Sequence, residues 1–306
     1  MRRSKTKTPE AIDRLTAQSN RFAEITKRRF GFAYLVFRLN PASFLGLLIV
    51  VTLFLAAFFG PLALPYSPDK TNAPERFEAP SSSHLFGTDK YGRDVFTRVL
   101  SAARVDLFIA LGSIGLAFVI GTAIGSLAAY FGKAVDTVLM RIMDMIKSFP
   151  QFILGMALVA ALGPGVRNLI IVITVIMVPS FARMIRSRIV SLREMPYVDA
   201  ARTSGVPWWK IITAYLIPNS LGTMVVTAAL NVSYAMLDAA GLSYLGLGVR
   251  PPQAEWGTMI SEGTSQLLAG RWWISVFPGL ALFLCVLGFN LLADGLRDIF
   301  DPRMRR

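Results

Sequence analysis

Polar and apolar residues are segregated into long blocks along this chain. Six stretches contain no Asp, Glu, Lys, Arg or His: Leu39–Pro68, Leu107–Gly132, Ser148–Val166, Asn168–Ala182, Ile211–Leu237 and Trp272–Ala293. A helix needs about 20 mostly apolar residues to cross a bilayer core of roughly 30 Å, and four of the stretches contain 22 to 30 residues. Stretches this long favour helices over the shorter strands of a barrel. The pattern predicts an all-α integral membrane protein with about six transmembrane helices.

The two shorter stretches, Ser148–Val166 and Asn168–Ala182, are separated only by Arg167, next to the turn sequence Gly163-Pro164-Gly165. We expect a tight helical hairpin with its turn at one membrane face. The alternative is one long buried helix together with a re-entrant segment.

Composition and charge add a predicted topology. Of the 306 residues, 54% are hydrophobic, and the formal net charge is +13. With a cytoplasmic N-terminus and six crossings, the inner segments carry 23 Lys and Arg residues and the outer segments carry nine. This bias follows the positive-inside rule and predicts that both termini are cytoplasmic. We therefore attribute the basic character to topology, and expect no nucleic-acid partner.

The polar segments predict the following organisation: a cytoplasmic tail at 1–43, a first span at 44–64, an outer loop at 65–105, a core with five further spans at 106–294 and a cytoplasmic tail at 295–306. The first tail includes a predicted juxtamembrane helix at Arg28–Phe37, which combines two Arg residues with aromatic and aliphatic residues. Near the end of the outer loop, Asp94 precedes apolar residues at helical spacing. It is expected to cap a short amphipathic helix on the outer surface.

Few residues are candidates for catalysis. His84 is the only histidine and Cys285 the only cysteine, so no zinc cluster can form and no metal site is expected. A lone His in a polar loop is expected at the surface, and Asp89 and Asp94 are expected in turn and cap roles. No phosphate-binding G-x-x-x-x-G-K-[ST] sequence occurs. We expect a protein that is not an enzyme and binds no cofactor itself.

The inner loop at 183–210 is the most informative segment. Pro196 can occupy the first position of a helix, and Tyr197–Ser204 can form two turns. Gly205 suits the left-handed residue that ends a helix, and Pro207 prevents its continuation. Small residues on this projecting helix would let a partner approach closely. The alternative is a solvated connector helix.

Motifs in this loop and elsewhere carry a family resemblance. Asp199-Ala200-Ala201, Gly205 and Ile217-Pro218 resemble the EAA motif of the transmembrane subunits of ABC importers, with Asp in place of Glu and Ile in place of Leu. Three further segments resemble permeases of the DppC/OppC type: Gly87–Asp94 (GTDKYGRD), Gly241–Gly248 followed by Pro251-Pro252 and Glu255-Trp256-Gly257, and Asp294–Asp298 followed by Asp301-Pro302-Arg303.

The resemblance implies a type I ABC importer permease (MetI-like) fold in the bacterial cytoplasmic membrane. It also implies a second permease chain of different sequence, two cytoplasmic ATPases that bind the ATP, and an extracytoplasmic solute-binding protein. The implied solutes are di- and oligopeptides or related compounds. The implied ATPase-coupling residues are Tyr197, Asp199, Ala200, Ala201, Gly205 and Pro218.

The translocation pathway has weaker signals. Irregular backbone at membrane depth is tolerated only where it is buried in protein or lines a wet cavity, so Asp238, Gly246 and Gly248 are candidate pathway residues. The alternatives to an ABC permease are a secondary transporter or channel that works without ATPases, and a membrane-embedded enzyme. Ion coupling is disfavoured because the centres of the predicted spans lack charged side chains.

Overall fold

The computed structural model describes residues 40–63 and 65–300. The predicted juxtamembrane helix at Arg28–Phe37 and the motif Asp301-Pro302-Arg303 lie outside these residues. The described part of the chain is helical, and its only β-type pairing is an isolated bridge between Thr88 and Asp94.

The α-helices are α2 (Pro41–Ala63), α3 (Val95–Phe131), α4 (Lys133–Ser148), α5 (Gln151–Leu162), α6 (Val166–Leu192), α7 (Pro196–Thr203), α8 (Trp208–Lys210), α9 (Ile217–Tyr244), α10 (Trp256–Thr264) and α11 (Trp273–Phe300). Two 3-10 turns, η1 (Ala73–Glu75) and η3 (Leu267–Ala269), lie in the connections, and a π-helical segment, η2 (Ile211–Leu216), joins α8 to α9.

Five helical segments are long and apolar enough to cross a membrane, and α4 with α5 forms a sixth candidate that is bent by 90°. The prediction of about six transmembrane helices is therefore confirmed. The turn at Gly163-Pro164-Gly165 separates α5 from α6 as predicted. Helix α5, which lies in the stretch 148–166 expected as one arm of the hairpin, has only 12 residues, and together with α4 it makes the bent candidate span.

The bend between α4 and α5 has a local cause. Proline disfavours the α conformation in the residue before it, and Phe149 is extended just before Pro150. The helix therefore ends at Ser148 and restarts at Gln151 in a new direction. The charged stretch before the bend is the amphipathic helix α4.

The second span differs from the prediction at its outer end. Asp94 does cap a helix, since its side chain accepts the backbone N–H of Thr97 at 2.7 Å. That helix, α3, is continuous for 37 residues and is not a separate surface helix. Its outer end is held against other segments of the chain, so it does not need to lie flat on the membrane.

The core is built around the pair α3 and α6, which run parallel to each other. Gly121 and Gly125 on α3 face the backbone of α6, so closely that a Cβ at Gly125 would lie 2.2 Å from the carbonyl oxygen of Ala182. Small residues at helix contacts allow such approach in a bilayer. Helix α2 packs on α11 in the same manner through Gly46 and Gly288.

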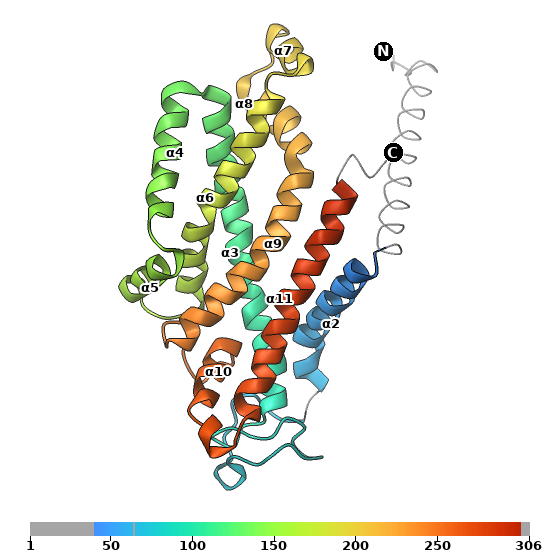
Figure 1. Cartoon of the computed structure of the whole chain (residues 1–306), viewed down its shortest axis with the longest axis vertical. Coiled ribbons are helices and arrows are strands. Elements are labelled where there is room, and N and C mark those ends of the chain that lie inside the picture. The colour runs from blue at the N-terminus through green and yellow to red at the C-terminus, as the bar shows by residue number, and fades with distance from the viewer. Residues whose placement is uncertain (1–39, 64, 301–306) are drawn as a thin grey trace, which may run out of the picture.

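Several connections gather at two opposite ends of the bundle, whereas α5 and its links to α4 and α6 lie part-way along it (Figure 1). One end holds α7 and the junction of α3 with α4, and the other holds the segment before α3 together with α10. This grouping agrees with the division into inner and outer segments that the charge distribution predicts.

Candidate functional site

Helix α7 projects from one end of the bundle as a short, isolated element (Figure 1). Pro196 opens it at the first helical position, as predicted. The helix has an inner face and an outer face. Val198 and Ala201 are buried in a cluster with Ile211 and Leu216 of the π-helical segment and α6 residues such as Ile189. The opposite face is exposed.

The exposed residues of α7 include Tyr197, Asp199 and Ala200. Among the residues that the structure describes, the Asp199 carboxylate pairs only with Arg202 of the same helix, at 3.2 Å, and its side chain remains 64% exposed. The two alanines of the motif therefore differ, because Ala200 lies on the free surface whereas Ala201 is only 7% exposed. The structure thus corrects the assumption that both alanines offer a surface to a partner.

Gly205 ends α7 in the way predicted. Its φ is +75°, its N–H donates to the carbonyl of Arg202, and the N–H of Val206 donates to the carbonyl of Ala201. This hydrogen-bond pair is the Schellman arrangement, which favours glycine at the left-handed position. A Cβ at Gly205 would meet nothing within 4 Å, so the backbone conformation alone accounts for the glycine.

Pro218 is the second residue of α9. The residue before it, Ile217, follows the π-helical segment and donates its N–H to the carbonyl of Ile212. Proline lacks an N–H, and its ring clashes with the carbonyl four residues earlier in an α-helix. The wider π turn relieves that clash. Pro218 thus accounts for the irregular turn that joins α7 and α8 to α9, which the sequence did not reveal.

At the other end, the segment Gly87–Asp94 forms a buried polar scaffold. Asp89 accepts the backbone N–H groups of Tyr91 and Arg93 and the Arg93 Nε at 2.6 Å. Arg93 also reaches Glu262 of α10 at 3.1 Å. Arg98 donates to the carbonyl of Pro68 at 2.8 Å. These contacts fasten the outer segment to α3 and α10.

One expectation about the outer loop is wrong. His84 is buried rather than at the surface, and its Nδ1 lies 2.9 Å from Asp94. Asp89 is also desolvated, at 3% exposure, although it does take the expected turn role. Both became buried because partners distant in the sequence cover the loop, among them Trp273, whose Nε1 donates to the carbonyl of Thr88.

The three candidate pathway residues lie near the end of α9. Asp238 is half-buried, and its carboxylate accepts a hydrogen bond from Gln151 at 2.6 Å. Gly246 has a φ of +79° and ends α9 with the same Schellman arrangement as Gly205. Gly248 packs so closely on Ser243 that a Cβ at Gly248 would lie 1.8 Å from the Ser243 Oγ. Backbone conformation and close packing thus account for both glycines. Of the three candidates, Asp238 is the one whose side chain offers a charged group to a solute.

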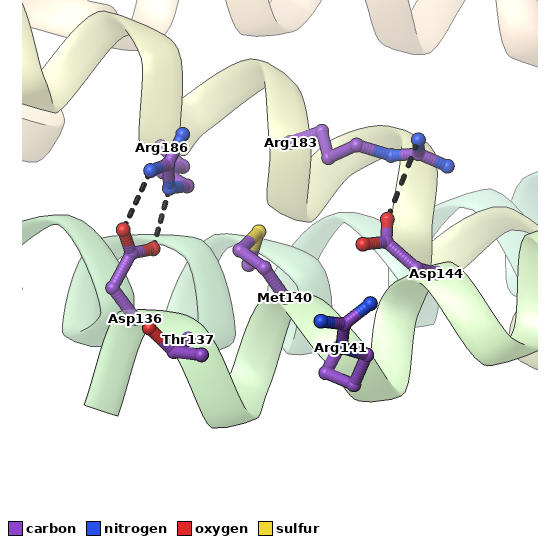
Figure 2. Close-up of a pocket in the computed structure, with 7 residues that line it drawn as sticks. All are labelled: Asp136, Thr137, Met140, Arg141, Asp144, Arg183 and Arg186. Atoms are coloured by element: carbon purple, nitrogen blue, oxygen red, sulfur yellow. Dashed lines mark hydrogen bonds and ion pairs between the residues drawn. The ribbon is translucent and has the colours of Figure 1, made fainter. Parts of the chain in front are cut away.

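A charged contact ties α4 to α6 (Figure 2). Asp136 faces Arg186 with two hydrogen bonds, and Asp144 lies 3.8 Å from Arg183. These side chains line an open pocket of about 400 Å³. The arginines were counted only as topology signals in the sequence, yet they hold α4 against the core.

Comparison with known proteins identifies the family. Residues 121–306 match the family described as binding-protein-dependent transport system inner membrane component. The chain belongs to this family. Residues 33–80 also match the N-terminal transmembrane domain of oligopeptide transport permease C.

Several relatives of this permease cover most of its length. It is 41% identical to the dipeptide transport system permease protein DppC of Alkalihalophilus pseudofirmus, over 87% of each chain. It is 38% identical to the probable D,D-dipeptide transport system permease protein DdpC of Escherichia coli, over 90% of this chain and 93% of the relative. It is 37% identical to the glutathione transport system permease protein GsiD of Pectobacterium atrosepticum, over 84% and 86%.

The fold is also shared with a solved structure. An inward-facing form of the MetNI methionine ABC transporter superposes with a TM-score of 0.53 at 20% identity, covering 66% of this chain and 96% of that one. The type I permease fold and the DppC/OppC-type resemblance are therefore confirmed. The chain is a multi-pass permease subunit of an ABC importer, and it is neither a secondary transporter nor an enzyme.

Proposed function

We propose that this permease forms, with a second permease chain, the pathway by which an ATP-driven importer takes up di- or oligopeptides. The observation that carries the substrate class is the set of relatives at about 40% identity named as peptide permeases. In this proposal an extracytoplasmic solute-binding protein delivers the peptide at the end that holds Gly87–Asp94 and α10. Asp238 contributes to the pathway, and Gly246 and Gly248 shape the chain beside it.

Two cytoplasmic ATPases would bind the ATP, and this chain would bind no nucleotide or other cofactor itself. Helix α7 supports this division of roles, because it projects from the bundle and leaves Tyr197, Asp199 and Ala200 uncovered. Gly205 and Pro218 would hold the helix at a fixed angle, and Ala201 would anchor it to the core. Movement of the ATPases could then be transmitted through α7 and the π-helical segment to α9, since contacts that differ between two states can shift their populations.

The function can be tested on the complex recovered from membranes. A tagged chain should bring down two ATPases and a second permease, and vesicles containing this complex and the binding protein should accumulate a labelled dipeptide only with ATP. The isolated chain should hydrolyse no ATP above a mock preparation. ATP-dependent uptake of another solute class but not of peptides would overturn the proposed substrate, and uptake by the chain alone would overturn the proposed mechanism.

The proposed orientation places both termini, and therefore α7, in the cytoplasm of a bacterium. Single cysteines at Ser82 and Ser204, both exposed, can be introduced in a Cys285→Ser background, in which the buried native thiol is absent. An impermeant thiol reagent applied to spheroplasts should label position 82 and spare position 204. Labelling of position 204 alone would reverse the topology.

A further inference from the structure

Asp238 is a carboxylate within a membrane-spanning helix, six residues before α9 ends at Tyr244. Its Oδ2 accepts one hydrogen bond, from the Gln151 side-chain amide at 2.6 Å. The described residues supply no hydrogen bond to its Oδ1. A charged side chain at membrane depth is costly unless it is paired or lines a wet cavity, and it commonly marks a solute pathway. One half of this carboxylate is therefore available to a ligand.

The fold places Gln151 beside Asp238 through two features. The 90° bend at Pro150 turns α5 toward α9, so Gln151 begins α5 close to α9. Gly241 then allows α5 to approach, since a Cβ there would lie 2.9 Å from the ring of Phe152. The amide donates to the carboxylate and orients it without neutralising its charge.

Two further side chains complete the surroundings. Tyr234 lies one turn before Asp238 on the same face of α9, and it is 58% exposed. An aromatic face next to a carboxylate is a combination that attracts organic cations. Lys147, at the end of α4, lies near Asp238, and no ion pair within 4.0 Å joins the two side chains. The acid and the base thus remain separate, each able to contact a zwitterion.

We propose that Asp238 binds the N-terminal ammonium group of a peptide in transit, with Gln151 as the residue that positions the carboxylate and Tyr234 facing the cation. Lys147 offers the complementary contact to a carbonyl or carboxylate oxygen of the peptide. This inference rests on the proposed peptide function. The ligand chemistry is a primary ammonium next to a peptide bond, so an N-acetylated peptide lacks the group that Asp238 would hold.

The test measures protection of a neighbouring thiol in the purified complex of both permeases and the ATPases. Leu237, adjacent to Asp238 and 48% exposed, is replaced by cysteine in the Cys285→Ser background. The rate at which this cysteine reacts with a small maleimide is measured at increasing concentrations of dialanine or of N-acetyl-dialanine. The binding protein is left out. Dialanine should slow the reaction and N-acetyl-dialanine should not.

Substitutions then show which side chains are responsible for the protection by dialanine. Asp238→Asn should raise the dialanine concentration needed for protection by about tenfold or more, the range expected for a charged hydrogen bond, whereas Asp238→Glu should retain most of it. Gln151→Leu should weaken protection to a smaller degree. Glu78→Gln, which removes an exposed acid of the outer segment, is the control and should change nothing.

Three outcomes would overturn the inference. The first is equal protection by both peptides, and the second is unaltered protection in Asp238→Asn. The third is failure of Asp238→Asn to assemble while Asp238→Glu assembles, because the carboxylate would then serve the contact with the second permease. A complex that imports dipeptides with ATP but gives any of these results retains the proposed function. A complex that imports no peptide contradicts both.

Discussion

Replacing Ala200 with tryptophan should abolish recovery of the ATPases with the permease while the permease itself stays folded. Ala200 is exposed on α7, on the side away from the buried pair Val198 and Ala201. An oversized side chain in a packed contact costs about 1–3 kcal/mol, which is roughly one to two powers of ten in affinity. On a solvated connector the same change would stay within about ±0.5 kcal/mol.

The measurement is pull-down of the ATPases from solubilised membranes, alongside peptide uptake in cells. Thr264→Trp introduces the same bulk on the exposed surface of α10, at the opposite end of the bundle, and should leave ATPase recovery unchanged. Ala201→Trp is not an equivalent variant, because Ala201 is buried and the change would disturb the permease itself. Normal recovery and uptake with Ala200→Trp would show that α7 is a solvated connector.

Adding a single methyl group to α3, by Gly125→Ala, should strongly destabilise the permease. The new Cβ would lie 2.2 Å from the Ala182 carbonyl oxygen and 2.3 Å from the Ile185 Cγ2. The first of these is a backbone atom of α6, so the clash can be relieved only by separating the two helices. Overpacking of this kind costs about 1–3 kcal/mol or more. This is a large part of the free energy of unfolding of a typical folded protein, which is about 5–15 kcal/mol.

Gly115 provides the matched control on the same helix, since a Cβ there would meet nothing within 4 Å. Gly115→Ala should be neutral or stabilising by up to about 1 kcal/mol, because alanine has the higher helix propensity. The two variants can be compared by the midpoint of thermal unfolding in detergent and by the yield of monodisperse protein. Equal midpoints would mean that α3 and α6 are not in the close contact described.

Several features of the permease followed from the sequence by itself, because each depends on a local pattern. Apolar stretches long enough to cross a bilayer identify most spans without knowledge of their neighbours. The ends of α7 were equally predictable, since Pro196 is suited to the first helical position and Gly205 to the left-handed cap. Motifs with characteristic spacing, such as Asp199-Ala200-Ala201 with Gly205, led to the family.

Other features were decided only by tertiary structure. His84 and Asp89 lie in a polar segment that resembles a solvated loop, and they are buried because residues as distant as Glu262 and Trp273 cover and pair with that segment. The contact of Gln151 with Asp238 likewise depends on the bend at Pro150 and on the approach of two helices that are far apart in sequence.

The two alanines of the Asp199-Ala200-Ala201 motif are a second case in which the sequence alone did not predict burial. Ala200 and Ala201 are adjacent and chemically identical, so no sequence pattern of this single chain separates their roles. The rotation of α7 against the π-helical segment buries Ala201 and exposes Ala200. That rotation is set by packing on Ile211 and Leu216, and burial depends on which neighbours a residue meets in space. The local sequence therefore determined that a helix forms here, and only the packed structure decided which of its faces remains free for a partner.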